Sequence, residues 1–152
     1  MDLNKLSTAD KVIGASALVF LIALFMPWYG LAGGSNNGWD YFLTGILPLL
    51  IAAAMVAVIA IQRFGTTELP RPPVPWAQIH LIAGVVIAAL LLLRVLITSD
   101  VDVLGESFDL DRKYGLWIAF IAAIGLGVGG YLKNQESEET VRGSSAPPST
   151  AV

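Results

Sequence analysis

The chain has 152 residues, of which 55% are hydrophobic and 14% are charged, and its formal net charge is −3 at pH 7. Soluble domains carry about 25% charged residues, so this composition and the mean hydropathy of +0.70 exclude an ordinary soluble domain. Cysteine is absent, which excludes disulfides, thiolate metal sites, attached haem and dithiol redox chemistry.

Four apolar stretches of about 20 residues are each long enough to cross a hydrocarbon core roughly 30 Å thick. None shows the alternating polarity of a barrel strand, so we expect each stretch to be a transmembrane helix. The first stretch is too long for the apolar region of a secretory signal, and we expect it to be retained. The predicted spans are residues 12–31, 41–61, 77–97 and 114–132. The predicted fold is all-α, a polytopic membrane protein with four transmembrane helices in an up-down bundle.

Lysine and arginine near the span ends predict the orientation, because cytoplasmic loops retain positive charge. Six of them fall on the side of the two termini and two on the other side; they are Lys5, Lys11, Arg63, Arg71, Lys133 and Arg142, against Arg112 and Lys113. We therefore expect both termini to be cytoplasmic and the chain to be a multi-pass membrane protein. Residues 1–11 form the predicted cytoplasmic N-terminus. The tail, residues 133–152, is polar and then rich in Gly, Ser and Pro, and is predicted to be disordered.

Local signals mark the ends and the interior of the spans. Ser7-Thr8-Ala9-Asp10 is typical of a helix start with a capping box. Pro48 falls inside the second predicted span, where a missing N–H group predicts a kink. The segment 70–75 is rich in proline and predicts a stiff polyproline II connection to the third span.

Small residues recur every four positions on one face of the fourth predicted span. They are Gly115, Ala119, Ala123 and Gly127. Such a face lets another helix approach closely. The partner is either another span of the same chain or a neighbouring copy, and intramolecular packing is the favoured alternative because a four-span bundle needs such contacts.

Arg94 is the one charged residue inside a predicted span, and ionisable groups within a membrane are candidate functional groups. It lies near the outer end, where its guanidinium group either pairs with an acidic side chain or binds an anionic headgroup or substrate. Arg112 and Lys113 belong to the same predicted level. The candidate anion or ion-pair site comprises Arg94, Arg112, Lys113, Asp40 and Asp100.

The sequence predicts no catalytic residue, cofactor or metal site. No carboxylate occurs within the predicted spans, whereas ion-driven transporters generally use one there. His80 is the only histidine, and a lone histidine at the interface is usually structural. The segment starting Asp100-x-Asp102 departs from a calcium-binding loop at Leu104 and Asp111. We therefore expect the protein not to be an enzyme and not to bind nucleic acid.

Four short motifs carry a family resemblance. They are Phe25-Met26-Pro27-Trp28-Tyr29, Gly38-Trp39-Asp40, Arg94 and Tyr114-Gly115-Leu116-Trp117. In this order and spacing the chain resembles small four-span membrane proteins of high-GC Gram-positive bacteria. The resemblance covers residues 12–132 and implies a plasma-membrane protein of unknown function, so it transfers no catalytic residue. All four motifs fall at the predicted outer level of the membrane.

Two functional hypotheses follow. The favoured one is a non-enzymatic accessory or structural subunit of a membrane complex, which contacts other membrane proteins or further copies of itself as a homo-oligomer as well as membrane lipids. The alternative is a small channel, carrier or lipid-binding protein with an outward-facing basic site for an anionic group. The second hypothesis depends on Arg94, Arg112 and Lys113, whereas the first depends on the small-residue face and the tail.

Overall fold

The computed structural model describes residues 3–31, 34–97, 100–103, 105–109 and 111–145, and it is mostly helical. Three helices within this part of the chain are long and apolar enough to cross a membrane, namely Phe42–Phe64, Trp76–Leu96 and Tyr114–Glu139. Their length and composition indicate a multi-pass membrane protein, as the sequence predicts. The prediction of an all-α fold needs correction, because short strands form two small sheets at one end of the helices.

The first long helix, α1 (Thr8–Leu24), begins and ends earlier than the predicted first span, and a short 3-10 helix, η1 (Leu3–Lys5), precedes it. A capping box fixes its start. The Ser7 hydroxyl accepts a hydrogen bond from the Asp10 N–H, and the Asp10 carboxylate accepts one from the Ser7 N–H, each 3.2 Å long. Beyond the other end, Pro27 lacks the N–H that a continuing helix requires, and the chain continues as a strand.

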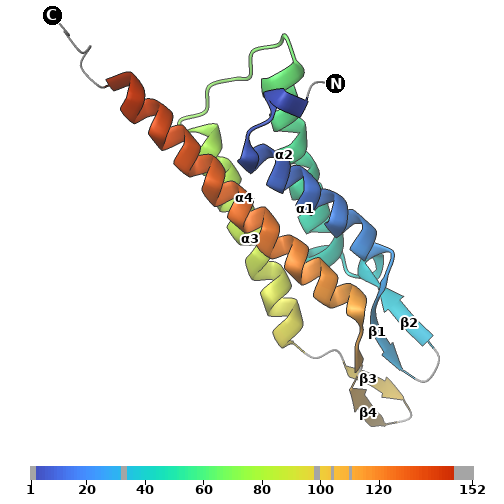
Figure 1. The fold of residues 1–152 in the computed structure, drawn as a ribbon. Helices are drawn as coiled ribbons and strands as arrows, with labels where there is room; N and C mark the ends of the chain where they lie inside the picture. The colour runs from blue at the N-terminus through green and yellow to red at the C-terminus, as the bar shows by residue number, and fades with distance from the viewer. Residues whose placement is uncertain (1–2, 32–33, 98–99, 104, 110, 146–152) are drawn as a thin grey trace, which may run out of the picture.

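Short strands lie at the end of the helices away from the start of α1, and we call this the strand end (Figure 1). The described residues form five of them. They are β1 (Pro27–Leu31), β2 (Gly34–Asn37), β3 (Asp100–Val103), β4 (Glu106–Asp109) and β5 (Asp111–Arg112). β1 pairs antiparallel with β2 and with β5, and β3 pairs antiparallel with β4. β1 replaces the end of the first predicted span, and the other four strands come from predicted loops. Their backbone groups bond to one another, which lowers the cost of placing them next to apolar helices.

The chain enters α2 (Leu47–Phe64) through two short helical turns, η2 (Gly38–Asp40) and the π-helical η3 (Phe42–Ile46). A Cβ atom on Gly45 would overlap the carbonyl oxygen of Gly38, so the two turns pack closely. Pro48 falls in the first turn of α2, directly after the π-helical η3. Prolines and π-helical turns are both usual sites of helix kinks, so the kink at Pro48 stays a prediction.

The helices α3 (Trp76–Leu96) and α4 (Tyr114–Ser145) run side by side, and α4 packs most extensively against α3 and α1 (Figure 1). The predicted small-residue face of α4 supplies these contacts. Ala119 and Ala123 are fully buried. A Cβ atom on Gly115 would lie 2.6 Å from the Pro27 carbonyl oxygen, and one on Gly127 would contact Gly84 of α3. This face is therefore used within the chain, which is the alternative that the sequence analysis favours.

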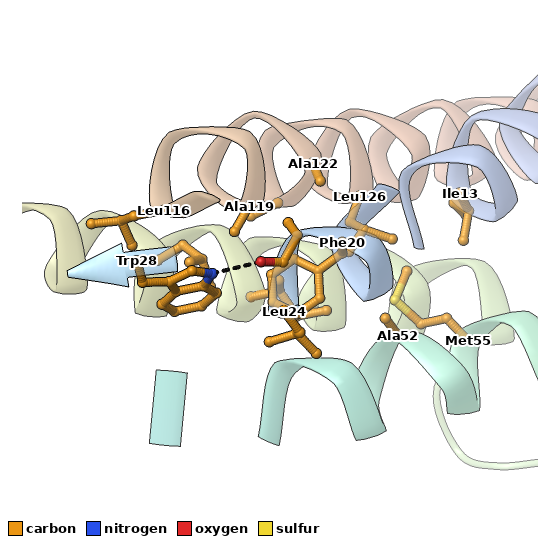
Figure 2. Packing of buried hydrophobic residues seen from close by; sticks show 14 of the residues in the cluster. Ile13, Phe20, Leu24, Trp28, Ala52, Met55, Leu116, Ala119, Ala122 and Leu126 are labelled. Carbon is orange, nitrogen blue, oxygen red and sulfur yellow. Dashed lines mark hydrogen bonds between the residues drawn. The ribbon is translucent and has the colours of Figure 1, made fainter. Parts of the chain in front are cut away.

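The core lies where α1 meets α4 and α2 (Figure 2). Its labelled members come from these three helices and β1: Ile13, Phe20, Leu24, Trp28, Ala52, Met55, Leu116, Ala119, Ala122 and Leu126. Trp28 is fully buried, and its indole Nε1–H donates a 2.8 Å hydrogen bond to the Ala23 carbonyl oxygen at the end of α1. Because that carbonyl belongs to the last turn of α1, where helix carbonyls lack intrahelical partners, the bond also secures the turn into β1.

The fourth helix does not end at Leu132. The helix continues to Ser145. The prediction of a disordered tail, residues 133–152, is therefore wrong for residues 133–145, which are helical, and residues 146–152 lie outside the described part of the chain. Two contacts with the start of α1 explain the extension. Lys133 pairs with Asp10, and Glu136 accepts a 3.3 Å hydrogen bond from Ala9 N. Glutamate, lysine and glutamine in this stretch also favour helix over coil.

The close approach of α3 to α4 at Gly84 makes the first prediction. A Cβ atom there would lie 2.5 Å from the Leu126 carbonyl oxygen and 2.9 Å from the Gly127 Cα. We expect Gly84→Ala to destabilise the protein by about 1–3 kcal/mol, because backbone atoms must move apart. Thermal unfolding of the detergent-solubilised protein, followed by circular dichroism, measures this loss.

Gly127→Ala is the matched control in the same interface. Its Cβ atom would lie 3.6 Å from the Gly84 carbonyl oxygen, which is ordinary van der Waals contact. Since alanine is the better helix former by up to about 1 kcal/mol, we expect this variant to unfold at or above the wild-type temperature. If Gly84→Ala and Gly127→Ala lower the unfolding temperature equally, the two glycines do not differ in how closely the opposite backbone approaches them.

Candidate functional site

Arg94, in the last turn of α3, lies against two tyrosine rings at the strand end. Its guanidinium carbon is 3.8 Å from the ring centroid of Tyr41 and 4.7 Å from that of Tyr29. Tyr29 belongs to β1, and Tyr41 lies directly before η3. A cation over an aromatic face is attracted by the ring quadrupole, with a gain of about 2 kcal/mol where water is excluded. The strand β1 and the entry to α2 thus each supply one ring that holds the cation of α3.

Tyr29 also fixes the backbone of α3. Its side chain is fully buried, and its hydroxyl donates a 2.9 Å hydrogen bond to the Arg94 carbonyl oxygen. Burial and this hydrogen bond hold the phenol beside the last turn of α3.

A cavity of about 310 Å³ opens beside this cation, between the entry to α2 and the end of α3. Arg94 and Thr44 supply polar groups, and the apolar wall includes Leu93 and Ile97. The π-helical turn η3 forms one side, and such turns occur frequently at functional sites. The volume is at the lower end of the range of small-molecule sites, which is sufficient for a headgroup or a small anion.

Arg112 and Lys113 lie along β1, outside the lining of this cavity. Arg112 is opposite Tyr29 in the strand register. Lys113 donates its backbone N–H to the Trp28 carbonyl oxygen at 2.7 Å, and its side chain passes so close to Gly30 that a Cβ atom there would lie 2.6 Å from the lysine Cε. The three predicted cations are therefore gathered around one strand, and only Arg94 faces the cavity.

The two predicted carboxylates have different positions. Asp40 lines the cavity, but its carboxylate accepts a 2.8 Å hydrogen bond from the Asn37 N–H and so caps η2. Asp100 begins β3 and pairs with Asp109 in the strand register, while its side chain lies outside the described part of the structure. Sequence reasoning missed Tyr29 and Tyr41 as partners of Arg94, because an aromatic residue near a span end equally fits an interfacial anchor.

A second charged cluster, also missed from the sequence, lies at the opposite end of the helices, which we call the Asp10 end. The Asp10 side chain is fully buried between a 2.7 Å ion pair with Arg63 Nε and a 2.6 Å ion pair with Lys133 Nζ. These pairs join α1 to α2 and to α4. The sequence does place Asp10, Arg63 and Lys133 at the same predicted membrane level, which is the signal that could have indicated this cluster. The capping-box pattern explains Asp10 equally well from the sequence alone.

The charge on Asp10 is set by its partners. Burial alone raises the pKa of Asp10, but the hydrogen bonds from Lys133 and Ser7 N, with the charges of Lys133 and Arg63, lower it below its ordinary value. Asp10 precedes the apolar stretch that begins at Val12, so the cluster lies at the edge of the apolar region. A buried carboxylate with two cations is costly to break, because removing one partner leaves an uncompensated charge.

His80 is buried and used within the fold. Its Nδ1 lies 2.8 Å from the Trp76 carbonyl oxygen and its Nε2 lies 3.1 Å from the Met55 carbonyl oxygen, so the ring links α3 to α2. Among the described residues, no group of three or more His, Asp or Glu side chains could hold a metal ion.

Comparison with known proteins gives no assignment: no family model, curated protein or solved structure matches this chain.

The Asp10 cluster makes the second prediction. We expect Asp10→Asn to lower the free energy of unfolding at pH 7 by about 3–5 kcal/mol, because Lys133 then remains buried without its counter-ion. A carboxylate whose pKa is lower in the folded state stabilises the protein above its unfolded pKa and loses this effect as the pH falls through the folded pKa. The difference between wild type and variant should therefore shrink below about pH 4.

Unfolding in detergent between pH 7 and pH 3 measures this difference. Glu138→Gln removes an exposed carboxylate from the same part of α4 and is the control, for which we expect wild-type behaviour throughout. A gap between Asp10→Asn and wild type that stays constant down to pH 3 would show that Asp10 does not act as a charged group.

Proposed function

We propose that the chain is a four-span protein of a bacterial plasma membrane with both termini in the cytoplasm. The three long apolar helices support three of the crossings. The fourth would be the apolar part of α1 that follows Lys11, with β1 completing the path. Positive charge supports the orientation, since six lysines and arginines lie on the side of the Asp10 end.

We propose that this protein binds an anionic group from the outer side, in the cavity beside Arg94, without catalysing a reaction. The position of the Arg94 guanidinium, against two tyrosine rings in the wall of a cavity, is the observation that carries the proposal. The rings contact the face of the guanidinium group, while its N–H groups lie in the plane and point to its edge. An edge with several donors matches phosphate and carboxylate oxygens.

The proposal explains why charge is concentrated at this end. Arg112 and Lys113 flank β1 on the exposed side, where they would attract an anion before it reaches Arg94. At the predicted membrane level, anionic groups are supplied by outer-leaflet headgroups or by solutes in the surrounding water. The proposed function uses no catalytic residue, cofactor or metal.

Native mass spectrometry of the protein in mild detergent, titrated with phosphatidylglycerol and with inorganic phosphate, tests this proposal. We expect Arg94→Gln to weaken binding of the anionic probe at least about tenfold, because a hydrogen bond to a charged group is worth about 1.5–3 kcal/mol. Arg71→Gln removes a distant exposed arginine and should bind normally.

If Arg94→Gln binds both probes as tightly as wild type while remaining folded, the site is not at Arg94. If it unfolds, Arg94→Lys separates the two roles. Lysine keeps the charge but lacks the planar fork, so weaker binding by a folded Arg94→Lys variant supports the proposal, and unchanged binding contradicts it.

One observation favours a second function, that of an accessory subunit of a membrane complex. The small-residue face that could have met a partner is buried within the chain, but α4 continues from the bundle as a helix to Ser145. Its exposed side chains in the described stretch include Glu138 and Glu139. A projecting helix with an acidic surface suits contact with a basic segment of another protein on the cytoplasmic side.

Truncation after Glu139 tests the accessory function, because it removes the end of the helix and keeps the contacts of Lys133 and Glu136 with α1. If the protein is an accessory subunit, gentle extraction should yield a complex of fixed stoichiometry with wild type but not with the truncated form. Anion binding at Arg94 should be the same in both. Recovery of wild type without any partner would contradict this second function.

A further inference from the structure

A second cavity, of about 320 Å³, lies at the Asp10 end, where the end of α2 and the start of α3 meet α4. Its lining includes Arg63 and Gln62 of α2, Trp76 of α3, and Lys133 and Ser137 of α4. It is separate from the Arg94 cavity, because Arg94 belongs to the last turn of α3 and Trp76 to the first. The cavity therefore belongs to the opposite membrane surface.

Two cations line this cavity. Lys133 is nearly buried, with 8% of its side chain exposed, and Arg63 is 37% exposed. Both pair with the one carboxylate of Asp10, but Arg63 does so through Nε. The Nη amino groups, which carry four of the five donors of a guanidinium group, are not used in that pair.

The two carboxylates near this cavity, Asp10 and Glu136, accept hydrogen bonds at the start of α1. Asp10 accepts a hydrogen bond from Ser7 N, and Glu136, which also lines the cavity, accepts one from Ala9 N. These two carboxylates therefore compensate the positive end of the α1 dipole. The charges facing the cavity from all its walls are Arg63, Lys133 and Glu136.

The positive end of α3 opens into the same cavity. The helix begins at Trp76 after Pro75, which makes no side-chain capping bond, and both Trp76 and Ala77 line the cavity. The N–H groups of Gln78 and Ile79 donate to the Pro75 carbonyl oxygen, so those of Trp76 and Ala77, together with the helix dipole, are the ones that favour an anion here. The indole of Trp76 fits the headgroup level of a membrane.

We infer that this cavity binds a phosphate group, held by the Arg63 amino groups, Lys133 and the first turn of α3. Guanidinium, ammonium and helix N–H groups are the three donors that phosphate oxygens accept most strongly. The phosphate is either that of a phospholipid headgroup in the adjacent leaflet or a free ion. A basic pocket between helices at the cytoplasmic surface is a known arrangement for anionic headgroups.

Thermal unfolding of the full chain in dodecyl maltoside, with two probes, tests this inference. The probes are inorganic phosphate, against chloride at equal ionic strength, and a short-chain phosphatidylglycerol, against a diacylglycerol of the same chain length. We expect phosphatidylglycerol, phosphate or both to raise the Tm of wild type by several degrees. A response to phosphate alone in water identifies the free ion as sufficient, and a response only to the lipid identifies the headgroup.

Three variants locate the site, and Arg94→Gln is their common background so that the outer cavity does not contribute. Arg63→Gln should abolish the shift. Gln62→Glu adds a carboxylate to the lining and leaves the Asp10 ion pairs intact, so it should abolish the shift in a protein as stable as its background. Arg71→Gln removes the same charge from the neighbouring connection, outside this cavity, and should keep the shift.

The inference is overturned if neither probe shifts the Tm, or if Gln62→Glu keeps the full shift. These outcomes are independent of the proposed function at Arg94 when its mass-spectrometry test is run in the Gln62→Glu background, in which the Asp10-end cavity does not contribute. A lost shift in Gln62→Glu together with a retained shift in Arg71→Gln supports the phosphate site.

Discussion

The close packing of α3 on α4 is the constraint on which the rest of the structure depends. At Gly84 and at Gly130 the two backbones approach so closely that a side chain has no room: a Cβ atom on Gly130 would lie 2.5 Å from the His80 carbonyl oxygen. In lipid the hydrophobic effect does not bring helices together, so van der Waals contact between small residues must do so. These contacts fix the register of α3 along α4, with Arg94 at one end and Trp76 at the other.

The helix α2 is held differently, and the two cavities follow from this. It makes fewer contacts with α3 than α4 does. Its attachment uses individual polar links, namely the His80 ring at the Met55 carbonyl oxygen and the Arg63 pair with Asp10. Space therefore remains between α2 and α3 at each end, and each space is lined by an arginine, Arg94 or Arg63. Both proposed anion sites are consequences of one loosely packed helix pair.

The two ends solve the same physical problem in different ways. A charge at the edge of an apolar bundle must be compensated. At the strand end, the rings of Tyr29 and Tyr41 stabilise Arg94 through their π faces, and the proposed ligand would bind at the edge of the guanidinium group. At the other end, Asp10 is compensated by two full charges. Arg94 is therefore the better candidate for binding an exchangeable ligand, whereas the main role of the Asp10 cluster is to connect α1 to α2 and α4.

Composition and hydropathy by themselves determined that the chain is a multi-pass membrane protein, and they predicted the spans that became α2 and α3 and the small-residue face of α4. These are local properties, readable from periodicity within about 20 residues. Only the tertiary structure decided that Asp10 is buried, that Tyr29 and Tyr41 contact Arg94, and that α4 continues to Ser145. The partners of Asp10 are 53 and 123 residues away in the sequence, and such distances close only when the helices pack.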